Sequence, residues 1–338
     1  MQNSAIKSQR DRSIDFMRFI GIFLIVMAHN REGLPNTLFE FRSFDVPLMV
    51  FVSGLCFSGK YISNTKQFLL RRTPRLIIPL YVFLTAYFLL CFFIIYMFGV
   101  NTNLNFRMVA ESYLLLGGIG FVWIIKVFLL IMLLTPALLY VYRKLPNITL
   151  FCIIALVTQT LYIKYVGGVE SSTPFQFFIR EFVLYATGYS IVFLCGLQAG
   201  NPNSRLKSAI PWFLLLLIYF VYHIATENNA ILPINKHKYP PADIFLVYGC
   251  AISFLLNLLR PIFSKLANRI TDFVGSNTMW IYLYHIPLVS PFSRIEVHWS
   301  LRFLTMFCIA MTITYLQVTF SHRAENKWPW SGWKYLRG

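Results

Sequence analysis

The sequence predicts an all-α membrane protein, a polytopic helical bundle of about ten transmembrane helices with both termini in the cytoplasm. Over 338 residues, 57% are hydrophobic and only 13% are charged, and the mean hydropathy is +0.61. This composition lies far outside that of a soluble globular domain. Two further observations support the prediction: the apolar residues gather into ten segments, and the basic residues gather between alternate pairs of them.

The ten apolar segments follow one another with only short connections. They cover residues 14–29, 44–57, 76–98, 122–142, 149–166, 182–197, 210–225, 244–259, 274–289 and 301–320. Several are shorter than the ~20 residues that span a bilayer, so we expect short, tilted or interfacial helices. No connection is long enough for a soluble domain, and residues 1–338 are therefore predicted to form a single membrane domain.

The basic residues give the orientation, because cytoplasmic loops of membrane proteins carry an excess of Lys and Arg. With ten spans both termini share one side. Nineteen of the 30 Lys and Arg residues fall on that side, nine fall on the other, and Arg18 and Lys126 lie inside segments. The sequence thus predicts cytoplasmic tails at residues 1–13 and 321–338, in a multi-pass protein of the cell (inner) membrane.

Neither the net charge of +17 nor the six cysteines indicate an additional binding partner or a disulfide. A basic excess sorted onto alternate loops is explained by topology and by anionic membrane lipids, so we expect no nucleic-acid partner. The cysteines show no CxxC pair and lie in or beside apolar segments, which predicts small buried hydrophobes and no disulfides. Because Asp15 and Arg18 interrupt the first segment, that segment is predicted to be a retained helix and not a signal peptide.

His29 and Arg18 are the first candidate functional residues. The step of eleven residues turns an α-helix through three turns plus roughly 20°, which aligns the two side chains about 16 Å apart. Asp15 is spaced to pair with Arg18 on the helix surface. Ionisable residues inside a membrane segment favour a functional site. The alternative is that Asp15 and Arg18 anchor the helix at the headgroups and that His29 marks the far interface.

A second candidate site follows the second apolar segment. Arg72 and Arg75 stand three positions apart in a basic stretch over residues 60–75. Guanidinium groups at this spacing are suited to a diphosphate or a 3′-phosphate. Positive-inside charge explains the same residues without a ligand. Ser53, which precedes Gly54, is either a hydrogen-bond donor in the site or part of a close helix contact.

These motifs, taken together, resemble the acyltransferase 3 family. The resemblance rests on four motifs in the family's order: Arg18 with ten residues before His29, Val46-Pro47-Leu48 with Val52-Ser53-Gly54, Arg72-x-x-Arg75 before Leu76, and Trp280-Ile281-Tyr282-Leu283-Tyr284-His285. The family comprises integral-membrane acyltransferases of about ten helices that modify cell-surface sugars, often by O-acetylation. The resemblance is weak in the middle of the chain, where Trp123 and Gly188-Tyr189 are similar to family positions.

The resemblance implies that His29 is the catalytic residue, that Arg18 is required beside it, and that Arg72 and Arg75 bind acyl-CoA. A neutral imidazole suits a general base that deprotonates a sugar hydroxyl, and a covalent acetyl-histidine is the other possible role. His285 is predicted to approach His29 or the acceptor and, with Ser53, to bind substrate; a structural role is the alternative.

The predicted enzyme is an O-acetyltransferase for carbohydrate hydroxyls. Its partners are acetyl-CoA or another acyl-CoA as donor substrate, a glycan or lipid-linked sugar as acceptor, and membrane lipids. No bound cofactor and no metal are expected, because the remaining histidines form no helical ligand pair. The loops over residues 99–120 and 226–243 either shape the acceptor site or are ordinary connections. A transporter or flippase of lipid-linked saccharides is the alternative function, although no inverted repeat is visible.

Overall fold

The computed structural model describes residues 10–99, 104–165, 173–227, 231–328 and 332–337, and contains helices and no strand within these ranges. The helices, in chain order, are α1 (Arg12–Ala28), α2 (Asn36–Phe41), η1 (Arg42–Phe44), α3 (Asp45–Phe57), α4 (Thr65–Phe98), α5 (Phe106–Tyr113), α6 (Trp123–Lys144), α7 (Ile148–Tyr165), α8 (Pro174–Phe178), η2 (Ile179–Val183), α9 (Leu184–Ala199), α10 (Arg205–Glu227), η3 (Ile234–His237), α11 (Asp243–Leu258), α12 (Arg260–Leu266), α13 (Arg269–Ser276), α14 (Thr278–Ser293), α15 (Trp299–Lys327) and α16 (Trp333–Leu336). The all-α prediction is therefore confirmed for the described chain.

Each of the ten apolar segments overlaps one of the longer helices, and the two largest differences from the predicted boundaries are at α4 and α15. Helix α4 begins at Thr65, well before residue 76, because the Asn64 side chain accepts a hydrogen bond of 2.9 Å from the backbone N–H of Gln67 and so caps the basic stretch as helix. Helix α15 continues through Lys327, past the predicted start of the tail at residue 321. The basic residues in both places are good helix formers, so the helices continue through them.

Fewer helices qualify as membrane spans by length and composition than the ten crossings predicted. Among the described residues, six helical stretches are long and apolar enough to cross a membrane: α4, α6, α7, the stretch from α8 to α9, α10 and α15. The bent pair α11 and α12, with 63° between them, would make seven. Helices α1, α3 and α14 have 17, 13 and 16 residues, fewer than a perpendicular span requires. Ten crossings and two cytoplasmic termini stay predictions.

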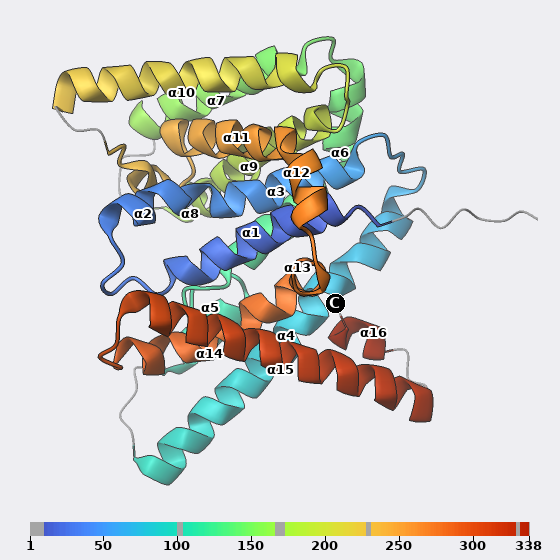
Figure 1. Ribbon diagram of the computed structural model, residues 1–338, viewed down its shortest axis with the longest axis vertical. Coiled ribbons are helices and arrows are strands. Elements are labelled where there is room, and N and C mark those ends of the chain that lie inside the picture. Colours follow the sequence, from blue (N-terminus) through green and yellow to red (C-terminus); the bar gives the residue numbers. More distant parts are fainter. Residues whose placement is uncertain (1–9, 100–103, 166–172, 228–230, 329–331, 338) are drawn as a thin grey trace, which may run out of the picture.

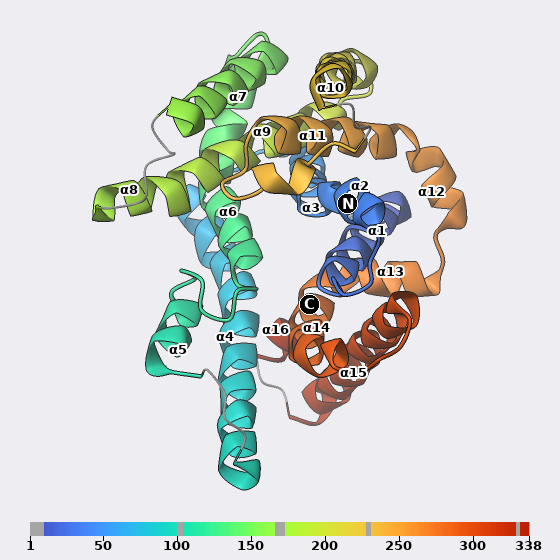
Figure 2. The same cartoon turned by 90° about the vertical axis from the view of Figure 1, so that its left-hand side faces the viewer.

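Most of the long helices run side by side, whereas α4 crosses them obliquely and extends past the others at its Phe98 end (Figure 1). Helices α7 and α10 lie at one edge of the bundle and α14 and α15 at the opposite edge, with α1 and α3 between them (Figure 2). The apolar window of the span ending in α9 is 72% buried, against 11% for α10. Helix α9 is therefore central, and α10 presents its apolar side chains to lipid.

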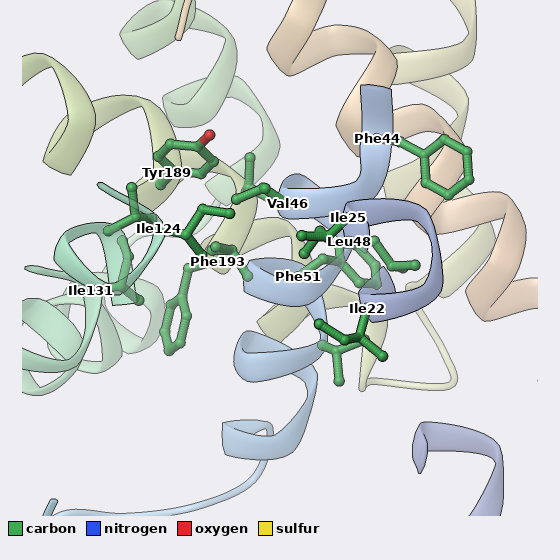
Figure 3. Packing of buried hydrophobic residues seen from close by; sticks show 14 of the residues in the cluster. Ile22, Ile25, Phe44, Val46, Leu48, Phe51, Ile124, Ile131, Tyr189 and Phe193 are labelled. Carbon is green, nitrogen blue, oxygen red and sulfur yellow. The ribbon is translucent and has the colours of Figure 1, made fainter. Parts of the chain in front are cut away.

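The centre of the bundle is the contact between α3 and α9, which depends on two glycines. A Cβ atom on Gly54 would collide with the backbone carbonyl of Phe193, and one on Gly196 would collide with that of Phe51. Such close backbone approach is typical of small residues between membrane helices. Large apolar side chains of α1, α3, α6 and α9 fill the space around this crossing (Figure 3). The pairing holds α3 in place, and α3 in turn packs against α1, which carries His29 and Arg18.

Candidate functional site

His29 lies one residue past the end of α1 and is paired with His285 of α14. Its backbone N–H bonds to the carbonyl of Val26 at 3.2 Å, so the ring is held at the last turn of the helix. The Nδ1 atom of His29 is 2.8 Å from Nε2 of His285, and the two rings stack with centroids 4.9 Å apart. His285 is fully buried, whereas His29 is partly exposed. Of the two residues, His29 is therefore the less buried.

The segment before α6 closes over this pair of rings. Phe121 meets the His29 ring edge-on, with centroids 4.9 Å apart. The hydroxyl of Tyr282 donates a hydrogen bond to the backbone carbonyl of Phe121, and the carbonyl of Tyr282 is bonded to Nδ1 of His285. The predicted loop over residues 99–120 thus ends directly beside the histidine pair, and Tyr282 connects the two.

A buried group of three charges lies on the same side of the bundle and was missed by the sequence analysis. Arg42 donates to Asp45 at 2.6 Å, and the ammonium of Lys238 lies 4.0 Å from the same carboxylate. All three are less than 10% exposed, and the charges of Arg42 and Lys238 act on the ring of His29. Burial lowers the pKa of Lys238, while Asp45 opposes that effect. The sequence does contain a signal for this group: Arg42 and Asp45 stand three positions apart, as Asp15 and Arg18 do, and this spacing allows an ion pair on one helix.

Arg18 lies at the other end of α1, away from His29. Its guanidinium donates to Asp15 at 3.2 Å, as predicted, and to the sulfur of Cys56 in α3 at 3.2 Å. Asp15 is buried and also accepts from Arg10. The arginine side chain is 32% exposed. Asp15 thus neutralises part of a positive charge that is still open to a ligand.

Arg72 and Arg75 face a cavity between α3, α4, α6 and α9. This inner cavity has a volume of about 190 Å³ and is mostly apolar; Ser53, Phe57, Arg72, Arg75, Phe128, Met132, Thr135 and Phe193 are among its lining residues. An outer, polar pocket of about 360 Å³ shares the two arginines and adds Asn64 and Arg71. The charge of Arg18 also acts on Arg72. The guanidiniums of Arg72 and Arg75 therefore line both pockets, and Arg18 lies near enough for its charge to act on Arg72.

The candidate residues thus fall into two groups. We call the first, His29 and His285 with Phe121 and the buried charges, the histidine end, and the second, Arg18, Arg72, Arg75 and Ser53, the arginine end. Ser53 and His285, which the sequence analysis grouped as substrate-binding, lie in different groups. The hydroxyl of Ser53 donates to the Met49 carbonyl of its own helix at 3.0 Å, and its neighbour Gly54 makes the close contact with α9.

Two other features of the sequence find an explanation. Lys126, an unassigned cation inside an apolar segment, forms an ion pair of 2.7 Å with Glu181. All six cysteines are free thiols. The prediction that they are all buried is wrong. Cys308 is exposed on α15, and Cys56 and Cys91 are half-buried. An exposed cysteine on an apolar helix remains a small hydrophobic side chain, and here lipid can cover it.

Comparison with known proteins gives one result. A family model described as an acyltransferase domain, of the acyltransferase 3 type, matches residues 11–319, nearly the whole chain. No curated protein and no solved structure matches the chain. The matched range includes every residue of the histidine end and of the arginine end.

Proposed function

Because the chain belongs to the acyltransferase 3 family and is a membrane acyltransferase, we propose that it transfers an acetyl group from acetyl-CoA to a hydroxyl of a cell-surface glycan or lipid-linked sugar. The single observation that carries this proposal is the hydrogen bond between the rings of His29 and His285. This pair lies at one end of α1, and the other end of α1 carries Arg18, whose charge acts on Arg72 beside a cavity.

The arginine end suits the donor. Coenzyme A carries a diphosphate and a 3′-phosphate at one end and an apolar, amide-containing arm that ends in the thioester at the other. Guanidinium groups bind phosphate oxygens through paired, charge-assisted hydrogen bonds. The outer pocket at Arg72 and Arg75 is polar and the inner cavity is apolar. We assign the phosphates to the outer pocket and the arm to the inner cavity, which leads the thioester into the bundle.

The histidine end suits the transfer step. The hydroxyl oxygen of the acceptor attacks the thioester carbonyl carbon, and its proton passes to the imidazole of His29. The new C–O bond forms and the C–S bond breaks, so the acetyl group becomes an ester of the sugar. The proton then passes from the imidazolium to the departing thiolate, and His29 returns to its neutral form. We expect the rings of Phe121 and His285, which contact His29, to limit the access of water to the thioester.

Aromatic rings support a place for the acceptor beside His29. Trp123 and Tyr239 meet edge to face with centroids 5.1 Å apart, and the ammonium of Lys238 lies 5.1 Å from the Trp123 ring. Tyr239 is half exposed. Rings with an apolar face and a polar edge suit a saccharide, which has both kinds of surface. These residues come from the loop over residues 226–243 and from the start of α6.

The test is the acetate content of surface glycans. Cells lacking the protein are complemented with the wild type, with His29→Gln, or with His298→Gln, an exposed histidine outside both ends that serves as the matched control. Mass spectrometry of the glycans is expected to show acetyl esters with the wild type and the control, and their loss with His29→Gln at equal protein levels.

Two results would contradict the proposal. Normal acetylation by His29→Gln would remove the assigned base. A glycan whose amount outside the cell changes while its mass does not would instead favour the transporter or flippase, in which polar residues inside the bundle line a path.

A further inference from the structure

The geometry points to His285 as the residue that fixes the protonation of His29. We infer that His285 holds the neutral His29 ring with its proton on Nδ1, which leaves the lone pair of Nε2 directed away from His285 and available to the substrate. This inference rests on the proposed role of His29 and deepens it: His285 is then a positioning residue and does not contact the reacting atoms.

The first step concerns the far side of His285. Its Nδ1 atom is hydrogen-bonded to the backbone carbonyl of Tyr282, three residues earlier on α14. A carbonyl oxygen can only accept, so Nδ1 of His285 must carry a proton and donate it. A neutral imidazole has one N–H and one lone pair. Nε2 of the neutral His285 ring is therefore an acceptor.

The second step passes this constraint to His29. Nε2 of His285 faces Nδ1 of His29 at 2.8 Å, a hydrogen-bond distance for two ring nitrogens. Because Nε2 accepts, Nδ1 of His29 must donate. The neutral His29 ring then has its lone pair on Nε2, the position that a general base or a nucleophile needs. The backbone carbonyl of Tyr282 thus determines the tautomer of a ring on another helix.

The hydrogen bond between His29 and His285 also stabilises the protonated form of His29 that proton transfer produces. When Nε2 of His29 takes the proton of the hydroxyl, the ring becomes an imidazolium, and its Nδ1–H donates to the neutral His285 through a charge-assisted bond. No rotation of either ring is required. In the Ser-His-Asp triad a carboxylate has the corresponding task, and there the wrong tautomer costs roughly 10⁴ in turnover. The buried cations Arg42 and Lys238 act against the positive charge of that imidazolium, and the bond to His285 offsets part of their effect.

Tyr282 holds both parts of this arrangement. Its carbonyl accepts from His285, and its side-chain hydroxyl donates to the Phe121 carbonyl, while the Phe121 ring contacts the ring of His29. The ring of His29 is therefore restrained by His285 on one side and by Phe121 on another. We assign the Nε2 side to the substrate.

The experiment is nitrogen NMR of the full chain labelled with ¹⁵N-histidine in lipid nanodiscs, because protonated and unprotonated ring nitrogens have well-separated shifts. The signals of His29 are identified by their loss in His29→Gln. We expect a protonated Nδ1 and an unprotonated Nε2 in the wild type, a mixture of tautomers in His285→Ala, and the wild-type pattern in His298→Gln. An unprotonated Nδ1 in the wild type, or an unchanged pattern in His285→Ala, would overturn the inference.

Kinetics with acetyl-CoA and cell-envelope glycan give a second reading. His285→Ala is expected to lower kcat about 10²–10⁴-fold with an unchanged KM for acetyl-CoA. His285→Gln, whose amide oxygen accepts a hydrogen bond, is expected to recover at least about tenfold of that loss. An equal loss in both variants, or a rise in KM alone, would contradict a positioning role. The NMR result does not depend on transfer, so a failure of the proposed function is separable from a failure of this inference.

Discussion

The two ends of α1 place charge in opposite environments. At the histidine end, the buried Arg42 and Lys238 share the buried carboxylate of Asp45, and the ring of the catalytic candidate is hydrogen-bonded to a second imidazole. At the arginine end, Arg72 and Arg75 are exposed at the entrance to two pockets, and among the described residues no carboxylate pairs with either of them. Two buried cations thus share one carboxylate at the histidine end, whereas Arg72 and Arg75 at the arginine end have none in the part of the chain that the structure describes.

This difference separates chemistry from binding. A base that takes a proton from an alcohol works best as a neutral, oriented ring in a dry site, and such a site tolerates charge only in compensated pairs. Donor phosphates need the reverse: several uncompensated cations that water can reach before the ligand arrives. The comparison predicts that substitutions at the histidine end change stability or turnover, and that those at the arginine end change donor affinity.

The largest expected effect is on stability at the histidine end. Asp45→Asn removes the carboxylate that compensates the buried Arg42 and Lys238, and breaking a buried ion pair by removing one partner costs about 3–5 kcal/mol. Thermal unfolding in detergent is expected to show a large drop in the melting temperature. Arg75→Gln, which changes a charge at the arginine end by the same amount, is the matched control and is expected to melt close to the wild type.

The double variant Arg42→Met, Asp45→Leu sharpens this result. Replacing both members of a buried pair by apolar side chains of similar volume is often close to neutral. Lys238 still lacks its carboxylate in that variant, so we expect part of the loss to remain. A single Asp45→Asn variant as stable as Arg75→Gln would show that the two ends do not differ in the way described.

The next effect is on donor affinity at the arginine end. Arg72→Ala is expected to raise the KM for acetyl-CoA about 10–100-fold with little change in kcat, because a hydrogen bond to a charged group contributes about 1.5–3 kcal/mol. Arg72→Lys keeps the charge but loses the paired donors, so an intermediate KM is expected. Steady-state kinetics at varied acetyl-CoA measure both, and a loss in kcat alone would place Arg72 in the transfer step.

The helices and one of the two sites were predictable from local sequence. Apolar runs marked all ten long helices, since side chains facing lipid must be apolar whatever their neighbours are. The pairing of Asp15 with Arg18 follows from a spacing of three positions on one helix, and the convergence of Arg72 with Arg75 follows in the same way. These features depend on residues close together along the chain.

The histidine end depends instead on residues far apart along the chain. His29 and His285 are separated by 256 positions, and Lys238 reaches Asp45 from a loop. Nothing in the periodicity of a helix states which other helix it faces. The start of α4 differs from the predicted boundary for another reason: apolar residues mark the membrane part of a helix, whereas α4 begins in a basic stretch that Asn64 caps.

The smallest effect we predict is the dependence of the KM on salt. Raising the ionic strength from about 0.1 M to about 1 M shortens the screening length from about 10 Å to about 3 Å. Phosphates approaching the exposed Arg72 and Arg75 are then attracted less, and the KM for acetyl-CoA is expected to rise several-fold, while kcat at saturating donor stays constant. In Arg72→Ala the same change of salt is expected to have a weaker effect, since one of the screened charges is gone. The buried charges at the histidine end are poorly screened, so a kcat that falls with salt while the KM stays fixed would mean that the exposed arginines do not bind the donor.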